Sequence, residues 1–532
     1  MSTSASGLGV DWDRGEQSER GNEGKRNSCH EFQRRGAWPF YVQPNQYLFR
    51  SWWSCDESRL LTWVSSLGLT GDFISRIASM AEPFKIAAVR HVSTTLTFNW
   101  RTDIMSTSKR FTRRHFLKSG SALAASAPFI LPSSIWSAEK SPNDRITLGF
   151  IGVGKQGGYL LNGFLKSKET QVVAVCDVDT TRREHRKKVV NDYYAKQTDA
   201  ASFKGCDEYK DFRELIARKD IDALVIAAPD HWHAIPVVMA AEAGKDMYCE
   251  KPLSLTIFEA RAMAKAVRKN NRVFQTGSMQ RSSKEFRIAC ELVRNGRIGK
   301  VKTVHVGVGA PSKWCDLAEE PMEPGLDWDM WLGPAPKRPY NSILSPRGVH
   351  DHFPSWRNYR EYSGGMMTDW GAHHFDIAQW GLGMDESGPV EIIPPDGKDY
   401  KMLTYKYANG VEMFHGGQSG VTFTGTEGTI FVTRGKYLVT PESIAKDPIS
   451  SSEVHLYKSD NHLADWLQCV RSRKRPICDV ETGCRSATVC HLGNLAYWNN
   501  RRLKWDPDKE IFLGDNEANN WLNPPKRAPW RV

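Results

Sequence analysis

The segment RITLGFIGVGKQGGYLLNGFLKSKETQVVAVCD, residues 145–177, has the order of a β-strand–turn–helix–β-strand unit. Residues 146–151 and 172–175 are apolar runs typical of buried parallel strands. A glycine-rich turn and the amphipathic residues 159–165 lie between them and predict a helix. This order predicts two neighbouring parallel strands joined by a crossover helix.

The glycines of this unit follow the spacing G-x-G-x-x-G, at Gly152, Gly154 and Gly157. The first allows a tight turn, the second lets the backbone approach a pyrophosphate, and the third lets helix and strand pack closely. Twenty residues after the last glycine stands Asp177, placed to accept hydrogen bonds from an adenosine ribose. The unit therefore predicts a dinucleotide site, with Lys155 and Gln156 of the same turn also contacting the cofactor.

The nucleotide is predicted to be NAD or NADP. Asp177 favours NAD, because a carboxylate pairs with a ribose hydroxyl and repels a 2′-phosphate. Arg182 and Arg183 lie close enough downstream to leave NADP open.

Strands and helices continue to alternate after this unit. Residues 221–228, 247–252 and 272–276 include further strands, and residues 234–243 and 256–269 predict helices. Such alternation predicts a doubly wound parallel sheet, whose ligands bind beyond the carboxyl ends of the strands. The polar or cofactor-contacting residues expected there are Pro229, Asp230, His231, His233, Glu250 and Lys251.

A second domain is predicted from Val301 onward, where strands follow one another without long helices between most of them. The expected strands span residues 301–308, 390–393, 401–407, 411–415, 428–433 and 436–439. Helices are expected over residues 461–471 and 481–499, the latter packing back toward the cofactor domain. The fold class is therefore α/β: a Rossmann domain followed by an α+β domain with a large, mostly antiparallel, open sheet. The boundaries expected are 144–276 for the Rossmann domain, 277–500 for the α+β domain and 501–532 for a tail packing on both.

Several spaced motifs resemble those of the Gfo/Idh/MocA oxidoreductases, a family that includes glucose–fructose oxidoreductase and inositol dehydrogenase. They are GVGKQG, Pro229-x-x-x-His233, Glu250-Lys251-Pro252, GSMQR at 277–281, and Gly364-Gly365-x-x-x-Asp369-x-x-x-His373. The resemblance covers about residues 144–500. It implies that the second sheet floors the substrate site and makes the interface of a homo-oligomer, a dimer or tetramer.

The last of these motifs suggests catalytic residues. On one helix Asp369 and His373, four residues apart, would share a face, so that the carboxylate orients the imidazole and raises its basicity. The family resemblance implies that Lys251 orients and polarises the substrate, Asp369 supports, and His373 is the acid/base. The alternative for Asp369 and His373 is a helix-capping or surface pair, which would be favoured if Lys251 were absent.

Other substrate contacts are weaker predictions: Gln280, Arg281, Trp356, Arg357 and His374. On a helix His374 points about 100° away from His373. The loop from His350 to Arg357 could line a sugar pocket or be an ordered surface loop. No metal site is predicted, because His350, Asp351 and His352 lack a tight ligand spacing.

An export signal is predicted in FTRRHFLKSGSALAASAPFILP, residues 111–132. Thr112 to Lys118 resembles a twin-arginine (Tat) motif, and the apolar run after it is shorter than the roughly 20 residues of a membrane span. A signal of this kind over residues 105–138 predicts translation from Met105 and makes residues 1–104 an upstream extension or disordered. A genuine N-terminal domain is the alternative. The expected location is the periplasm, reached through the Tat machinery, with membrane anchoring if the signal is not cleaved.

Charge and cysteine content exclude two other classes. The net charge is +11, yet residues 105–138 carry five basic residues and no acidic one, and residues 139–532 carry only +5. Without a long basic run, that surplus argues against nucleic-acid binding. The eleven cysteines form no C-x-x-C pair, which argues against zinc and a disulfide framework; Cys176 and Cys249 fit a buried core.

The sequence thus predicts an NAD(P)-dependent enzyme that moves hydride between a sugar, polyol or sugar derivative and a tightly held cofactor. The Tat signal supports tight binding, since that route exports folded proteins with their cofactors. Two alternatives remain. One is an NAD-dependent glycoside hydrolase or lyase acting through transient C3 oxidation, although such relatives tend to lack the lysine that stands here at 251. The other is a non-catalytic carbohydrate sensor.

Overall fold

The computed structural model describes residues 144–197 and 203–532 of the chain. The predicted Tat signal and the predicted upstream extension lie outside the described residues.

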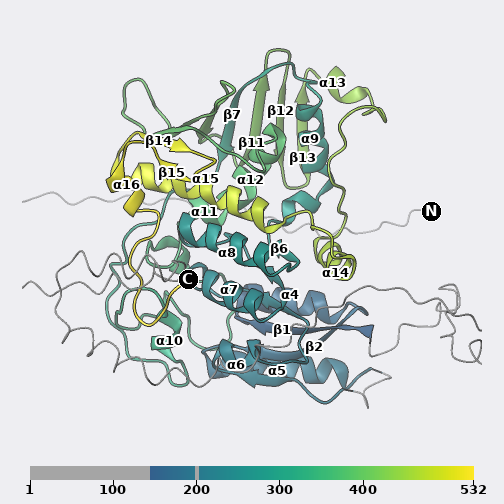
Figure 1. Ribbon diagram of the computed structural model, residues 1–532, viewed down its shortest axis with the longest axis vertical. Helices are drawn as coiled ribbons and strands as arrows, with labels where there is room; N and C mark the ends of the chain where they lie inside the picture. Colours follow the sequence, from purple (N-terminus) through teal and green to yellow (C-terminus); the bar gives the residue numbers. More distant parts are fainter. Residues whose placement is uncertain (1–143, 198–202) are drawn as a thin grey trace, which may run out of the picture. The chain divides into compact units, whose positions relative to one another are not determined.

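A six-stranded parallel sheet forms the first domain (Figure 1). Its order is β3-β2-β1-β4-β5-β6, the order of a dinucleotide-binding Rossmann sheet. The strands are β1 (Ile146–Ile151), β2 (Thr170–Cys176), β3 (Asp207–Tyr209), β4 (Ala223–Ile226), β5 (Asp246–Cys249) and β6 (Phe274–Thr276). Every residue of β4 and β5 is buried, as expected of strands covered on both faces. The Rossmann prediction is confirmed.

The crossover helices of this sheet are α4 (Lys155–Leu165), α5 (Thr180–Tyr194), α6 (Phe212–Ile216), α7 (Ala234–Glu242) and α8 (Ile257–Lys269). Their starts follow from the sequence. Thr256 accepts a hydrogen bond from the amide of Glu259, whose carboxylate bonds back to the amide of Thr256, so that a capping box begins α8. In contrast, α4 begins at Gly154 without any side-chain cap, which leaves amide groups at its N-terminus available to a ligand.

The second domain is built on a nine-stranded sheet of order β13-β12-β11-β7-β10-β9-β8-β14-β15. Only the β7–β10 pair is parallel. The strands are β7 (Val301–Gly307), β8 (Glu391–Ile393), β9 (Thr404–Lys406), β10 (Glu412–His415), β11 (Gly420–Gly425), β12 (Thr429–Thr433), β13 (Lys436–Thr440), β14 (Leu503–Asp506) and β15 (Ile511–Phe512). The predicted mostly antiparallel sheet is confirmed.

Two parts of this sheet were not predicted. Strand β11 lies between β7 and β12, where Val421 and Phe423 point into the core and Thr422 and Thr424 point outward. Strands β14 and β15 extend the sheet from β8, whereas the later residues Trp521 and Trp530 pack against the second core and the Rossmann core.

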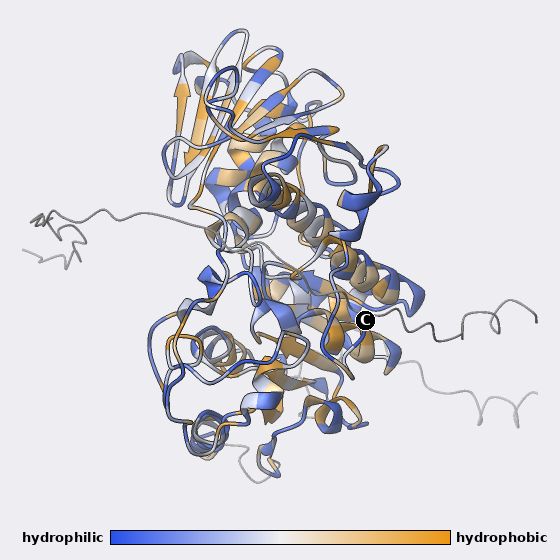
Figure 2. Cartoon of the chain, turned by 90° about the vertical axis from the view of Figure 1, so that its left-hand side faces the viewer, coloured by the Kyte–Doolittle hydropathy of each residue, from blue (hydrophilic) through white to orange (hydrophobic). Residues whose placement is uncertain are grey.

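One face of the sheet is covered by α9 (Lys284–Arg294), α12 (Gly371–Leu382) and α15 (Val480–Asn499) (Figure 2). Alternating residues of β12 show the consequence: Ile430 and Val432 are buried and their neighbours are not. The remaining helices of the described chain are α10 (Trp328–Leu332), α11 (Met366–Asp369), α13 (Ser443–Lys446), α14 (His462–Ser472) and α16 (Asn516–Asn520).

Helix α15 belongs to the cores of both domains. Its first turns place Val480, Cys484 and Ala487 in the core of the Rossmann domain, as predicted. Its later turns place Val489 and Leu492 in the core under the nine-stranded sheet. Helix α14 also returns to the Rossmann domain, where the Trp466 ring contacts Phe164 and Tyr248.

Arg281 is a correction to the sequence analysis. Its side chain is 2% exposed and its guanidinium binds the Asp376 carboxylate in α12 at 2.8 Å and the Asp385 carboxylate at 2.7 Å. Ser486 of α15 donates to Asp376 at 2.7 Å. The predicted substrate contact is therefore a buried ion cluster that joins α12 to α15.

Replacing Asp376 by asparagine should lower the free energy of unfolding by about 2 kcal/mol, because Arg281 would keep its buried charge and lose a charged hydrogen-bond partner. Chemical denaturation measures this change. Asp385→Asn is the matched control, since Asp385 has a side chain that is 35% exposed and should matter less. Equal effects of the two substitutions would contradict the assignment of Asp376 as the buried partner.

Two further features concern the described residues only. No helix among them is both long enough and apolar enough to cross a membrane. Their nine cysteines are free thiols, and Cys176 and Cys249 are buried as predicted.

Candidate active site

The glycine-rich turn after β1 has the geometry that a dinucleotide needs. Gly152 has φ of 80°, and a Cβ there would lie 2.6 Å from the Ala228 amide nitrogen. A Cβ on Gly157 would lie 2.0 Å from the Gly152 carbonyl oxygen, so helix and strand can approach this closely only with glycine. At Gly154 an added Cβ would meet no protein atom within 4 Å. The turn thus leaves open space at the position where a pyrophosphate would lie.

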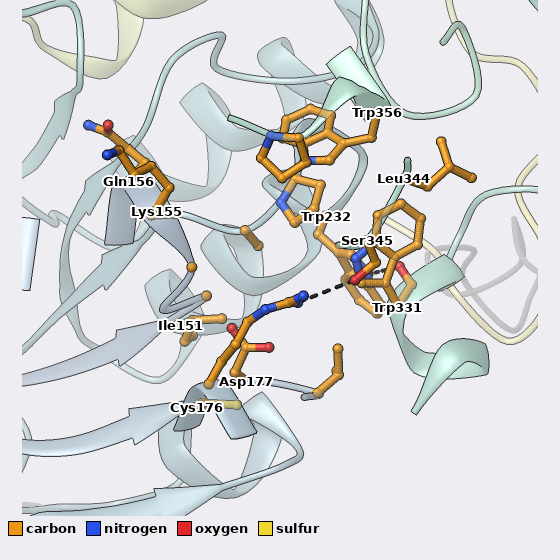
Figure 3. Close-up of a pocket in the computed structure, with 18 of the residues that line it drawn as sticks. Ile151, Lys155, Gln156, Cys176, Asp177, Trp232, Trp331, Leu344, Ser345 and Trp356 are labelled. Carbon is orange, nitrogen blue, oxygen red and sulfur yellow. Dashed lines mark hydrogen bonds between the residues drawn. The ribbon is translucent and has the colours of Figure 1, made fainter. Parts of the chain in front are cut away.

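A cavity of about 120 Å³, open to solvent, extends from this turn (Figure 3). Asp177 and Cys176 lie at one end, and Lys155 and Gln156 lie at the other. One Asp177 carboxylate oxygen accepts from the Val153 amide at 2.9 Å. These residues fit a dinucleotide: the turn and the start of α4 would hold its phosphates, and Asp177 its ribose.

Residues 326–357, here called the strap, form the opposite wall of this cavity. The strap is fastened to α5 by Arg182, which donates to Ser345 Oγ at 3.3 Å, to the Gly348 carbonyl at 3.2 Å and to the Pro346 carbonyl. Lys155 donates to the Asp351 carbonyl at 2.9 Å and pairs with its carboxylate. The guanidinium of Arg182 is therefore hydrogen-bonded to the strap and is not free to bind the 2′-phosphate of NADP.

A second cavity, of about 550 Å³, shares lining residues with the first. The residues lining both include Lys155, Gln156, Ala228, Trp356 and Arg357. The second cavity adds Asp230, His233, Glu250, Lys251, Asp369, Trp370, His373 and Arg434. Because the two cavities share these residues, a ligand in the second would lie next to one end of a dinucleotide in the first.

Lys251 and Asp369 form an ion pair on the wall of the second cavity. Lys251 Nζ lies 2.8 Å from Asp369 Oδ1 and 2.9 Å from the Asp369 carbonyl oxygen. Arg357 Nε lies 3.3 Å from the same Oδ1. Burial opposes ionisation of Asp369, but the two cations outweigh it and lower its pKa. Asp369 is thus an ionised carboxylate that holds Lys251.

His373 has a different environment from the one predicted. The helix is interrupted between α11 and α12, Asp369 turns to Lys251, and His373 Nδ1 is buried without a hydrogen-bond partner among the described residues. The predicted carboxylate–imidazole pair is therefore wrong. Burial, followed by the charge of Lys251, holds the His373 pKa well below its usual value, so the imidazole is neutral at neutral pH.

Three more polar side chains, Glu250, His233 and Asp230, line the same cavity as the Lys251–Asp369 ion pair. Gln156 Nε2 donates to Glu250 Oε1 at 2.8 Å, and burial raises the Glu250 pKa. His233 is held between the Pro252 and Ala228 carbonyls, each at 2.8 Å. Asp230 accepts from Ser363 Oγ at 2.6 Å, and burial raises its pKa to about 7. A proton can therefore be exchanged at Asp230 near neutral pH.

Comparison with known proteins identifies the whole described fold. Residues 146–278 match the Gfo/Idh/MocA model "Oxidoreductase family, NAD-binding Rossmann fold". Residues 292–532 match the model "Oxidoreductase family, C-terminal alpha/beta domain" of the same family. The chain belongs to the Gfo/Idh/MocA oxidoreductase family. Its nicotinamide-binding domain is thereby established, and the resemblance drawn from the motifs is confirmed at the level of the family.

Individual relatives are distant. A 2,7-anhydro-N-acetylneuraminate hydratase of Mediterraneibacter gnavus is 27% identical over 34% of this chain and 43% of its own. An inositol 2-dehydrogenase of Salmonella paratyphi B is 31% identical over 30% of this chain and 44% of its own. A glycosyl hydrolase family 109 protein of Shewanella is 32% identical over 28% of this chain and 35% of its own. The chain spans less than half the length of these curated relatives.

The other predicted cofactor and substrate contacts of this Gfo/Idh/MocA chain lie in three different environments. Pro229, Trp356 and Arg357 line the cavities. His374 points away and contacts the Gly307 carbonyl through Nδ1 at 3.0 Å. Gln280, 2% exposed, does not line either cavity; with its amide turned so that both ends find partners, it donates to the His373 carbonyl at 3.1 Å.

The cavity residues that the sequence analysis missed include Arg434 and Trp370. Arg434 lies in the turn between β12 and β13, and no motif marks it. Trp370 interrupts the two helices and supports the Arg434 guanidinium, whose centre lies 4.6 Å from its ring. Asp230, by contrast, was marked by its position after β4.

Replacing Gly157 by alanine should weaken cofactor binding at least tenfold and lower the melting temperature, because α4 must move away from the Gly152 carbonyl. Gly154→Ala is the matched comparison. It should weaken cofactor binding with a smaller loss of stability, since its Cβ meets no protein atom. Titration with NAD and thermal denaturation of the apoprotein measure the two effects. Unchanged binding in both variants would rule out this turn as the phosphate site.

Proposed function

We propose that this protein is an NAD(P)-dependent oxidoreductase that moves a hydride between a hydroxyl-bearing carbon of a sugar, polyol or sugar derivative and a tightly held cofactor. The observation that supports it most is the joint placement of Lys251, Asp369 and His373 on one cavity that shares lining residues with the dinucleotide cleft.

In this proposal each residue has a defined step. The neutral His373 imidazole takes the proton of the substrate hydroxyl as the carbon is oxidised, and returns it in the reverse direction. The Lys251 ammonium stabilises the developing alkoxide, and Asp369 holds that ammonium in place. The bound nicotinamide supplies the hydride acceptor or donor.

NAD is the favoured cofactor. Asp177 faces the cleft, and Arg182 is bound to the strap. The contacts of Arg182 and Lys155 with the strap support slow release, because they would have to break before the cleft could open.

A second candidate is net hydrolysis or elimination through transient oxidation at C3. The hydratase and glycosyl hydrolase relatives support it. Lys251 favours the dehydrogenase, since it is placed to stabilise an alkoxide. A non-catalytic sensor is less favoured, because it would need neither an ionised Lys251–Asp369 pair nor a neutral imidazole.

The proposal includes location and assembly. The Tat-like residues 111–132 support export to the periplasm as a folded holoprotein. The uncovered face of the nine-stranded sheet, which exposes Leu438 and part of Phe431, supports a homo-oligomer.

The decisive experiment is to denature the protein purified from the periplasm and quantify the released nucleotide. Near-stoichiometric NAD or NADP would support a trapped cofactor and would name it. An empty protein that binds added cofactor weakly would contradict the trapped cofactor and leave an ordinary dehydrogenase or a sensor.

A further inference from the structure

The second cavity has more fixed positive charge than its carboxylates balance. Lys251 and Arg357 share the single carboxylate of Asp369. Lys155 is paired with Asp351 of the strap. Burial raises the pKa of both Glu250 and Asp230, which disfavours their charged forms. A fourth cation, Arg434, remains on the same wall.

Arg434 has no carboxylate partner within residues 144–197 and 203–532. Its guanidinium lies over the Trp370 ring, with 4.6 Å between the guanidinium carbon and the ring centroid. Its Nε donates to the Gln280 side-chain oxygen at 3.1 Å, in the amide orientation that satisfies both ends of Gln280. Among these described residues, none accepts a hydrogen bond from its two terminal nitrogens.

These contacts fix the guanidinium without neutralising it. The Trp370 face and Gln280 hold its plane and its Nε edge, so little side-chain entropy remains to be lost on binding a ligand. Gln280 also contacts the His373 carbonyl at 3.1 Å, which ties the position of Arg434 to the backbone of the proposed acid/base. The charge of Arg434 contributes to lowering the His373 pKa, so the two side chains are electrostatically coupled.

The two terminal nitrogens of the guanidinium form one free edge, which can bind a carboxylate in a bidentate manner. A neutral sugar hydroxyl would leave the charge unbalanced. We propose that Arg434, supported by Trp370 and Gln280, binds a carboxylate of the substrate, so that the preferred substrates are sugar acids and not neutral sugars. This inference rests on the proposed function and narrows its substrate class.

The expected gain is large enough to measure. A charge-assisted, partly desolvated hydrogen-bonded pair corresponds to about tenfold to hundredfold in affinity. The acid member of a matched pair should therefore bind the holoenzyme at least tenfold more tightly than its neutral partner. Arg434→Gln should remove this advantage, so that the ratio of the two affinities measured within that variant falls to about one.

The test is isothermal titration calorimetry of the holoprotein with three matched pairs: glucuronate and glucose, galacturonate and galactose, gluconate and glucitol. Arg434→Gln is compared with Lys436→Gln, which removes the same charge two residues away, from a side chain that does not line the cavity. Arg434→Lys tests geometry, since an ammonium keeps the charge and loses the bidentate edge.

Stronger binding of an acid, lost in Arg434→Gln and kept in Lys436→Gln, would support the proposal. It would be overturned if neutral sugars bound as tightly as acids, if no acid bound saturably, or if both charge variants lost affinity equally. Cofactor absorbance in the same samples separates the two proposals. Acids that bind without any redox change would refute the oxidoreductase, and neutral sugars that are oxidised would refute the role of Arg434 alone.

Discussion

Replacing His373 by alanine is expected to lower turnover by about 10²–10⁴-fold and to leave cofactor content unchanged. The imidazole lines the substrate cavity, and its Nδ1 has no hydrogen-bond partner among the described residues. Its removal therefore takes away the proton acceptor and breaks no structural contact of that nitrogen. Single-turnover absorbance of the bound nicotinamide measures hydride transfer directly. His455→Ala, in an exposed loop, is the control. Surviving turnover would refute the acid/base assignment.

The pH dependence of activity should also report the protonation of His373. Because burial and the Lys251 charge lower the His373 pKa, the imidazole stays neutral as the pH falls through about 6.5, where an ordinary histidine gains a proton. Activity should persist through that range and fall only at more acidic pH. A fall in activity near pH 7 would instead report Asp230, whose burial raises its pKa to about 7. Asp230→Asn should then remove that fall. For stability the sign is the same: protonating His373 opposes folding, so its contribution falls as the pH drops below about 6.5.

Replacing Lys251 by methionine should lower turnover by about 10²–10³-fold, because the methionine keeps the volume and removes the charge beside the developing alkoxide. Burial would then act more strongly on Asp369, whose pKa should rise with only Arg357 left beside it. Steady-state kinetics should show the loss in kcat more than in KM, since the interaction strengthens in the transition state. Lys269→Met, at the exposed end of α8, is the control.

A double substitution separates chemistry from stability in this pair. Lys251→Met leaves a buried carboxylate with one partner fewer, and Asp369→Asn in the same chain removes that charge. The double variant should recover stability without recovering turnover. Recovery of turnover would mean that Lys251 serves only to neutralise Asp369.

The Rossmann half could be predicted from sequence because each of its signals is local. Buried parallel strands are continuous apolar runs, and the glycine spacing marks a turn that the backbone alone defines. The nine-stranded sheet was predicted less completely. Strand β11 alternates valine and phenylalanine with threonine between glycines, so its apolar content is low although it lies centrally in the sheet.

Only those site residues that belong to motifs with a characteristic spacing could be predicted from the sequence. The Asp369–His373 pairing was wrong because Trp370 interrupts the helix and because Asp369 binds Lys251, which follows β5 and lies 118 positions earlier in the chain. Arg281 was misplaced because its partners, Asp376 and Asp385, are about a hundred residues away. Arg434 gave no signal, since a single arginine in a turn has no pattern. These contacts are tertiary, and periodicity does not encode them.

Helix α15 imposes a packing constraint that both domains share. It spans 20 residues, about 30 Å, and buries Val480, Cys484 and Ala487 in one core and Val489 and Leu492 in the other. Inserting one residue between Ala487 and Val489 would rotate one end by about 100° against the other and shift it by about 1.5 Å. Both cores would then lose their fit at once. The length of this helix and the direction of its side chains therefore affect both domains. A change in the angle between the domains would require the contacts of α15 to be repacked.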